Sequence, residues 1–125
     1  MKVMRNEIPI PCMDISSTDA VLVIKVGENI PNEWRSIKNV TYTYKLRIKT
    51  LNFHNPNDTS IVVEIYDDIP TSGVKVSEVV LYPGTVTVVD SSMVPYVFKR
   101  AIYVKLTSAP STPVKLCGVV EAVFP

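Results

Sequence analysis

The stretch "VTYTYKLRIKTLNF", residues 40–53, decides the fold class. Over its first nine residues, apolar or aromatic side chains alternate one by one with Thr, Lys and Arg. Because successive side chains of a strand point to opposite faces, this alternation predicts a β-strand with one buried and one solvated face. The alternation reverses at Leu51 and Phe53, which predicts either a β-bulge near Lys49 or a strand that passes from one sheet to another.

The same signal recurs along the chain, where short runs of Val, Ile, Thr and Tyr are separated by turn-forming residues. Besides Val40–Ile48, strands are predicted at Val21–Val26, Ile61–Tyr66, Val74–Tyr82, Thr85–Val89, Val97–Leu106 and Val114–Phe124, with a possible short strand at Lys2–Ile8. One or two helical turns are predicted at Pro31–Lys38. Seven or eight closely spaced strands predict an all-β fold, a single antiparallel β-sandwich of jelly-roll-like type over residues 1–125.

Two loops have specific turn chemistry. "YPGT", residues 82–85, places Pro before Gly as a type II turn requires, and this predicts a hairpin between the strands on either side. "SAPSTP", residues 108–113, contains two prolines that cannot donate to a strand ladder. We expect this second loop to cap an edge or an end of a sheet.

The composition restricts the partners. Thirteen basic residues against twelve acidic ones leave a net charge of +1. A net charge this small produces no overall electrostatic attraction for phosphate groups, so nucleic acid is not an expected partner. The longest apolar stretches, such as Ala20–Ile24, are far shorter than the roughly 20 residues of a spanning helix, so no membrane partner is expected. The first residues lack the apolar core of a secretory signal, which predicts synthesis in the cytoplasm without a signal peptide.

Cys12 and Cys117 leave two alternatives open. A disulfide between them would close a loop of about a hundred residues and stabilise the fold by roughly 4 to 5 kcal/mol in the chain-entropy model. The apolar run around Cys117 favours the other reading, in which Cys117 is a small buried thiol and Cys12 a loop residue. With one histidine and no CxxC pair, no metal site is expected.

The densest group of polar residues is "NFHNPNDTS", residues 52–60, which contains the single histidine, His54. Its Asn and Asp residues are explained by a turn, because they hydrogen-bond to nearby backbone. A calcium site that adds Asp67 and Asp68 is disfavoured, since hairpin geometry places them at the opposite end of the next strand. The chain contains neither a nucleophile elbow nor a phosphate-binding glycine loop. We therefore expect no enzyme, no catalytic residue and no cofactor.

Two apolar segments suggest assembly. The Ile-Pro alternation at Ile8, Pro9 and Ile10 cannot form a helix, and it predicts an extended arm over about residues 1–12 that lies across another subunit. The sequence "VVEAVFP" keeps apolar residues to its end, so we expect Phe124 to be covered by a partner.

A third candidate surface is basic. Alternating positions of one strand form a predicted stripe: Lys45, Arg47 and Lys49. Tyr66, Tyr82 or Tyr103 on neighbouring strands would turn this stripe into a stacking surface for glycan or nucleic acid. The alternative is an ordinary polar outer face whose basic side chains discourage edge pairing. The absence of Gln and the ten prolines are also compatible with a thermophilic source, although seven Asn residues argue against it.

The segment from "LNFHNPNDTSIVVEIYDDIP" through "LYPGTVTVVDSS" to "IYVKLTSAPSTPVKLCGVVEAVF" resembles small β-sandwich virion proteins of the decoration or capsid-associated kind. The likeness covers about the last 75 residues and rests on turn placement. It implies a non-enzymatic structural role, with a homo-oligomer or other virion proteins as partners and a virion or extracellular assembly as location. The alternative from a different class is a carbohydrate- or ligand-binding β-sandwich module, which would present Tyr or Trp on one exposed face.

Overall fold

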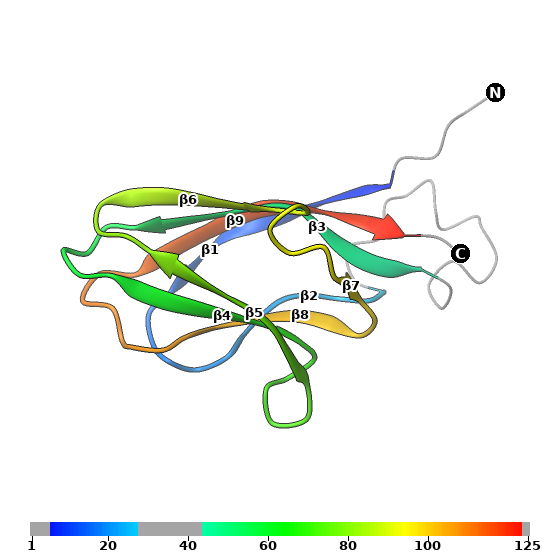
Figure 1. Ribbon diagram of the computed structural model, residues 1–125, viewed down its shortest axis with the longest axis horizontal. Coiled ribbons are helices and arrows are strands. Elements are labelled where there is room, and N and C mark those ends of the chain that lie inside the picture. The colour runs from blue at the N-terminus through cyan, green and yellow to red at the C-terminus, as the bar shows by residue number, and fades with distance from the viewer. Residues whose placement is uncertain (1–5, 28–43, 124–125) are drawn as a thin grey trace.

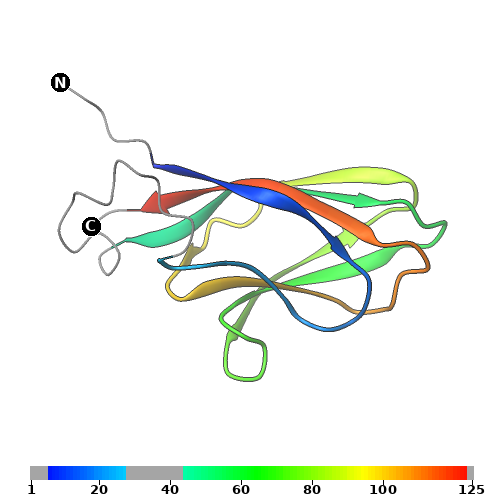
Figure 2. The same cartoon turned by 180° about the vertical axis from the view of Figure 1, so that it is seen from behind.

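The computed structural model describes residues 6–27 and 44–123, which form two antiparallel β-sheets packed face to face (Figures 1 and 2). The described residues contain nine strands and no helix: β1 (Glu7–Ile15), β2 (Val21–Lys25), β3 (Lys45–Asn55), β4 (Ile61–Asp67), β5 (Val74–Leu81), β6 (Thr85–Asp90), β7 (Val97–Phe98), β8 (Ala101–Leu106) and β9 (Val114–Val123). The predicted all-β sandwich is therefore confirmed.

The strands pair in a nested order. One sheet runs β1-β9-β3-β6, the upper layer in Figure 1, and the other runs β2-β8-β4-β5 below it. Thus β1 pairs with β9, β2 with β8, β3 with β6 and β4 with β5, as in a long hairpin wound around two sheets. This winding is the jelly-roll arrangement, which confirms the sequence prediction. The short β7 adds to β3 beyond the end of β6.

The core lies between the two sheets, and β3 shows how the sequence builds it. Leu46 and Ile48 are buried at the start of this strand, and Leu51 and Phe53 are buried at its end. The register with β9 shifts between Ile48 and Thr50, so a bulge absorbs one residue and both halves face the core. Of the two alternatives that the alternation left open, the β-bulge is correct.

The turn predicted at "YPGT" is present, but the predicted hairpin is wrong. The Thr85 N–H donates to the Tyr82 carbonyl oxygen over 3.3 Å, and Gly84 has a φ of 64°. However, β5 belongs to one sheet and β6 to the other, so this turn joins the two layers. The physical reason is that turns of types I and II splay the strands that follow, whereas hairpins prefer their mirror-image forms.

At the same end of the sandwich, the Asn-rich segment forms a turn, as predicted. The Asn55 side-chain amide donates to the carbonyl oxygens of Thr59 and Leu81, each over 3.0 Å. Asn57 donates to the Thr112 carbonyl over 2.9 Å and accepts the Thr112 N–H over 2.8 Å. These bonds hold the proline-containing loop before β9 against the turn. The prediction that this loop caps an end is confirmed.

Three other predictions concern boundaries. The predicted strand Val97–Leu106 is interrupted at Lys99 and Arg100, which separates β7 from β8. Of the possible strand Lys2–Ile8, residues 2–5 lie outside the described residues, and Glu7 and Ile8 belong to β1. The predicted helix Pro31–Lys38, the start of the strand at 40–43 and Phe124 lie outside the described residues. Within the described part of the chain, no helix is long and apolar enough to cross a membrane.

Candidate interaction surface

The Ile-Pro segment lies in β1, at one edge of its sheet. Ile8 faces Val120 of β9 in the ladder, and Ile10 faces Gly118. Both isoleucine side chains are buried in the core of this chain, whereas Pro9 is exposed. The prediction of an arm that lies across another subunit is therefore wrong for Ile8 and Ile10, because these side chains are buried in the chain's own core. Residues 1–5 of the predicted arm lie outside the described residues.

Cys12 and Cys117 form a disulfide across β1 and β9, with their Cα atoms 4.2 Å apart. The interpretation of two unbridged cysteines is therefore wrong. Sequence reasoning left the bond as an open alternative because the residues are separated by 105 positions, and only the pairing of β1 with β9 brings them together. The bond lies beside a register shift between Ile10 and Met13, so a covalent link holds an irregular part of the ladder.

The basic stripe on β3 is neutralised by carboxylates from neighbouring strands. The Arg47 guanidinium contacts the Glu121 carboxylate of β9 over 3.3 Å, and Lys49 forms an ion pair with Glu7 of β1. The hydrogen bond from Lys49 to Glu7, followed by the charge of Glu7, raises the pKa of the Lys49 amine. Lys45 is exposed at the start of the strand. Charge pairing across a solvated face thus accounts for Arg47 and Lys49.

The tyrosines lie elsewhere. Tyr66 and Tyr103 face each other across β4 and β8, in the sheet opposite the basic stripe. Both are half-buried, and the Tyr66 hydroxyl donates to the Glu64 carboxylate over 3.2 Å. The predicted combination of basic stripe and neighbouring tyrosines is therefore wrong for this pair, because the two groups belong to different layers. What exists instead is a separate tyrosine pair beside an acidic group.

His54 lies exposed near the end of β3. Its neighbours in the ladder are Val86 of β6 and Lys115 of β9. Neither is a carboxylate that would orient an imidazole as a general base.

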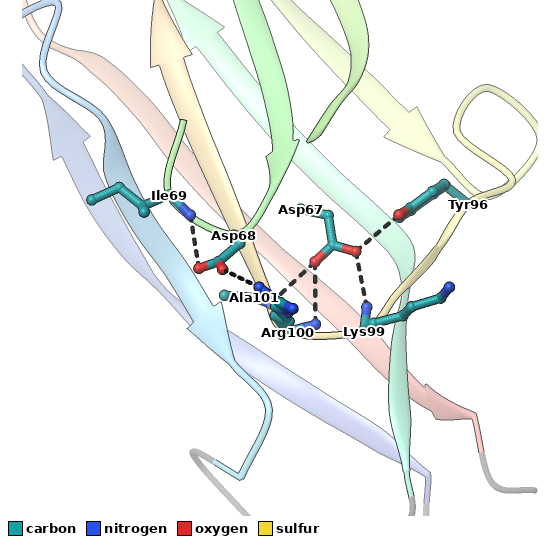
Figure 3. Close-up of polar contacts among 7 residues, drawn as sticks. All are labelled: Asp67, Asp68, Ile69, Tyr96, Lys99, Arg100 and Ala101. Atoms are coloured by element: carbon teal, nitrogen blue, oxygen red, sulfur yellow. Dashed lines mark hydrogen bonds and ion pairs between the residues drawn. The ribbon is translucent and has the colours of Figure 1, made fainter. Parts of the chain in front are cut away.

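A buried carboxylate organises the opposite end of the sandwich (Figure 3). Asp67, at the end of β4, is only 6% exposed. Its two oxygens accept four hydrogen bonds, from the Tyr96 hydroxyl (2.9 Å) and from the backbone N–H groups of Lys99 (3.1 Å), Arg100 (3.1 Å) and Ala101 (3.4 Å). Burial, and then this hydrogen bond to Asp67, raises the pKa of the Tyr96 hydroxyl. The carboxylate thus fixes the bend between β7 and β8.

Asp68 continues this cluster, as Figure 3 shows. It has a positive φ of 74°, and its carboxylate accepts the Ile69 N–H over 2.9 Å and contacts the Arg100 guanidinium over 3.3 Å. The Ile69 bond and then Arg100 lower the pKa of the Asp68 carboxyl. Both aspartates are thus engaged by donors of the protein. In residues 6–27 and 44–123, no three His, Cys, Asp or Glu side chains gather as a metal site requires.

The strongest candidate site is the edge strand β6, which sequence reasoning did not single out. In the described sheet, β6 pairs with β3 on one side, and its other side is an edge. The segment Thr85–Val89 contains neither a charged residue nor a proline. Val86 is 60% exposed and Val88 50% exposed, on the outer face of the sheet. Exposed, uncharged edge strands offer unpaired backbone groups to another chain.

A hollow beside β6 extends this apolar surface. It measures about 410 Å³ and lies between β5 and β6, where Val79, Val80, Tyr82, Thr87 and Met93 contribute to its walls. A second hollow, of about 270 Å³, continues toward the loop after β6 and shares Met93. We call β6 and these two hollows the open side of the sandwich. In Figure 1 this side is where β5 and β6 diverge from their common turn.

Comparison with known proteins adds no relative: no family model matches the chain, and no curated protein matches it. The inference about function therefore rests on the sequence and on the geometry of these surfaces.

Proposed function

We propose that this protein is a non-enzymatic structural subunit that builds a virion or a comparable assembly by adhesion through its open side. The observation that carries the proposal is the outer edge of β6, with which no strand in the described part of the chain pairs. Natural sheet edges are usually blunted by charge, proline, bulges or covering loops, because an open edge associates with other chains. The segment Thr85–Val89 of this edge lacks charge and proline and displays two exposed valines, which suits it to association.

The surrounding surface supports the same role. Of the exposed large apolar side chains of the described residues, Val86 and Val88 lie on β6, and Val80, Tyr82 and Met93 line the hollow beside it. The other two, Ile69 and Val74, lie at the far end of β5. Exposed apolar side chains that gather beside a hollow are typical of protein interaction sites. The jelly-roll winding is also common in viral capsid domains, although lectins share it, so the fold by itself does not choose between them.

The energetics require more than one contact. Each large apolar side chain that becomes fully buried contributes roughly 1.5 to 3 kcal/mol. Association costs an estimated 4 to 15 kcal/mol in lost translational and rotational freedom. A single valine would not hold two subunits together, and the edge, its valines and the adjoining hollow have to act jointly.

The disulfide supports a site of action outside the reducing cytosol. Bonds of this kind persist in secreted proteins and on virion surfaces and are rare in cytosolic proteins. A virion or another extracellular assembly is therefore the location that we propose.

The test is the solution mass, measured by light scattering over a wide range of concentration. The proposal expects a mass that rises with concentration toward a closed oligomer. A constant monomer mass at every concentration would contradict self-assembly. Adding roughly 1 M salt serves as a control, since an apolar interface should survive the screening that removes surface charge effects.

A second candidate function is glycan binding, favoured by the facing pair Tyr66 and Tyr103 beside Glu64. Flat aromatic side chains combined with a carboxylate acceptor suit a sugar ring. A glycan array probed with the wild type and with Tyr103→Ala tests it. Binding that is lost in the variant favours a carbohydrate module, whereas a blank array for the wild type removes this candidate.

A further inference from the structure

We propose that two copies of this chain pair through β6, antiparallel, about a two-fold axis at Thr87. This inference rests on the proposed function and specifies its contact. It makes the occupant of the open edge a second copy of the same strand. One continuous sheet would then run through both molecules.

The geometry of antiparallel pairing restricts the register. In an antiparallel ladder, two directly facing residues point their side chains to the same face of the sheet. When a strand pairs with its own copy about a two-fold axis, one residue therefore faces its own copy across that axis. An axis at Val86 places Pro83, which has no N–H, opposite Val89. An axis at Val88 places the charge of Asp90 opposite Val86. An axis at Thr87 avoids both conflicts.

With Thr87 on the axis, Val86 of each copy faces Val88 of the other, and Thr85 faces Val89. The outer face of the joined sheet then has four contiguous valines. In the folded chain Val86 and Val88 lie on this outer face beside His54 and Asn52, which are their partners in β3. β-Branched pairs of this kind stabilise antiparallel sheets.

The composition of the segment explains why a second copy fits. A two-fold interface needs a patch that complements itself, and like charges that face each other oppose it. No charge lies in Thr85–Val89. Asp90, just beyond it, faces Gly84 in this register, and its carboxylate already accepts hydrogen bonds from the Ser92 and Met93 N–H groups.

Two other edges of the same fold, β1 and β5, are less suited. The β1 edge contains Pro9 and Pro11, which have no N–H to donate. The β5 edge contains Lys75 and Glu78, which form an ion pair with each other. A copy that approached either edge would meet a missing donor or an already paired charge.

Register-specific cross-linking tests the inference. Val86→Cys and Val88→Cys are prepared separately, each with the native disulfide intact, and oxidised alone or as an equal mixture. Facing residues lie within the Cα range of a disulfide, whereas each cysteine alone has only a diagonal copy of itself at about 7–8 Å. We expect the mixture to form covalent dimer at least about tenfold faster than either variant alone.

Val74→Cys mixed with Val88→Cys is the matched control. Val74 is 61% exposed and lies at the far end of β5, so this pair of variants should not cross-link faster than background. Because the three substituted positions are at least half exposed, the variants should fold, and a denaturant midpoint equal to that of the wild type verifies this.

Light scattering of the wild type distinguishes failure of the proposed β6 contact from failure of the proposed assembly function. If the wild type self-associates but the mixture cross-links no faster than the single variants, pairing through β6 at Thr87 is overturned and the proposed assembly function stands. If the wild type stays monomeric at every concentration, both are overturned.

Discussion

The two edges of the sheet β1-β9-β3-β6 differ in proline content, in covalent attachment to the neighbouring strand and in exposed apolar surface. β1 has prolines at positions 9 and 11, a charged residue at Glu7 and a disulfide to its neighbour. β6 has an uncharged segment with two exposed valines. Both edges belong to the same sheet and share its core. The difference therefore shows that exposed apolar surface is localised rather than a general result of a Val-rich composition.

The largest effect should come from removing the disulfide that links the edge strand β1 to β9. Cys12→Ser combined with Cys117→Ser should lower the free energy of unfolding by about 2–5 kcal/mol, near the upper end because the closed loop is long. Denaturant unfolding of the oxidised wild type, the reduced wild type and the double variant measures it. Equal midpoints for all three would show that the disulfide does not secure β1.

A second change separates folding from association. Asp67→Asn replaces the carboxylate that accepts four hydrogen bonds with an amide. We expect this change to lower the free energy of unfolding by about 1.5–3 kcal/mol. Because Asp67 lies away from both edges, the association constant of the folded protein should not change. Thermal unfolding and light scattering together measure the two quantities. A parallel loss of association would mean that the β7–β8 bend shapes the interface.

Natural edge strands usually contain charged residues, so adding charge to β6 should remove its advantage over β1 in self-association. Val86→Lys with Val88→Lys should weaken self-association at least about tenfold, which is about 1.4 kcal/mol, since lysines from two copies would face each other. Sedimentation measures the dissociation constant. Val74→Lys is the control of equal exposure. Unchanged association in the double variant would exclude the β6 edge.

Removing one charge beside β1 should have a smaller effect. Glu121→Gln breaks the contact with Arg47, and for such a partly exposed pair we expect a change of at most about 1 kcal/mol in unfolding free energy. The difference should shrink in high salt, which denaturant curves at two salt concentrations reveal. A larger, salt-independent loss would indicate that this pair supports packing as well as charge balance.

The smallest expected effect is the response of the carboxylate at the end of β6, Asp90, to acid pH. The Ser92 hydroxyl, followed by the Met93 N–H, lowers the pKa of the Asp90 carboxyl below its ordinary 3.8. The stabilisation that the ionised Asp90 carboxylate contributes is therefore fully present above pH 3.8 and is lost as the pH falls through the lowered pKa of this group. NMR shifts of the Ser92 and Met93 amides measure this titration, and Asp90→Asn should abolish it. A midpoint at or above 3.8 would contradict the structure.

Local sequence patterns predicted much of the fold. Two-residue alternation identified the central strand, and Asn-Pro chemistry identified the turn after β3. The reversal of the alternation located an irregularity near Lys49 but left open whether it was a bulge or a change of sheet. These features depend on neighbouring residues, so a single sequence contains them. The Pro-Gly turn was also local, and it was found where predicted. That it joins two sheets was not predictable, because the destination of a strand depends on packing between distant segments.

The surfaces were predicted less well for the same reason. Asp67 becomes a buried acceptor through donors some thirty residues away, and the disulfide depends on the pairing of the first strand with the last. Arg47 and Lys49 looked available because their carboxylate partners lie on other strands. The signal for β6 was present in the uncharged segment Thr85–Val89, but its importance depends on the knowledge that β6 is an edge.

The nested pairing also has a consequence during synthesis on the ribosome. The strands β4 and β5 are synthesised close together and can pair early, whereas β1 has to wait about a hundred residues for β9. During this interval Ile8 and Ile10 have no completed core to enter, and such non-local pairing makes a nascent chain slow to fold and prone to aggregate. Chaperones that shield the emerging N-terminal segment should therefore raise the yield of folded protein.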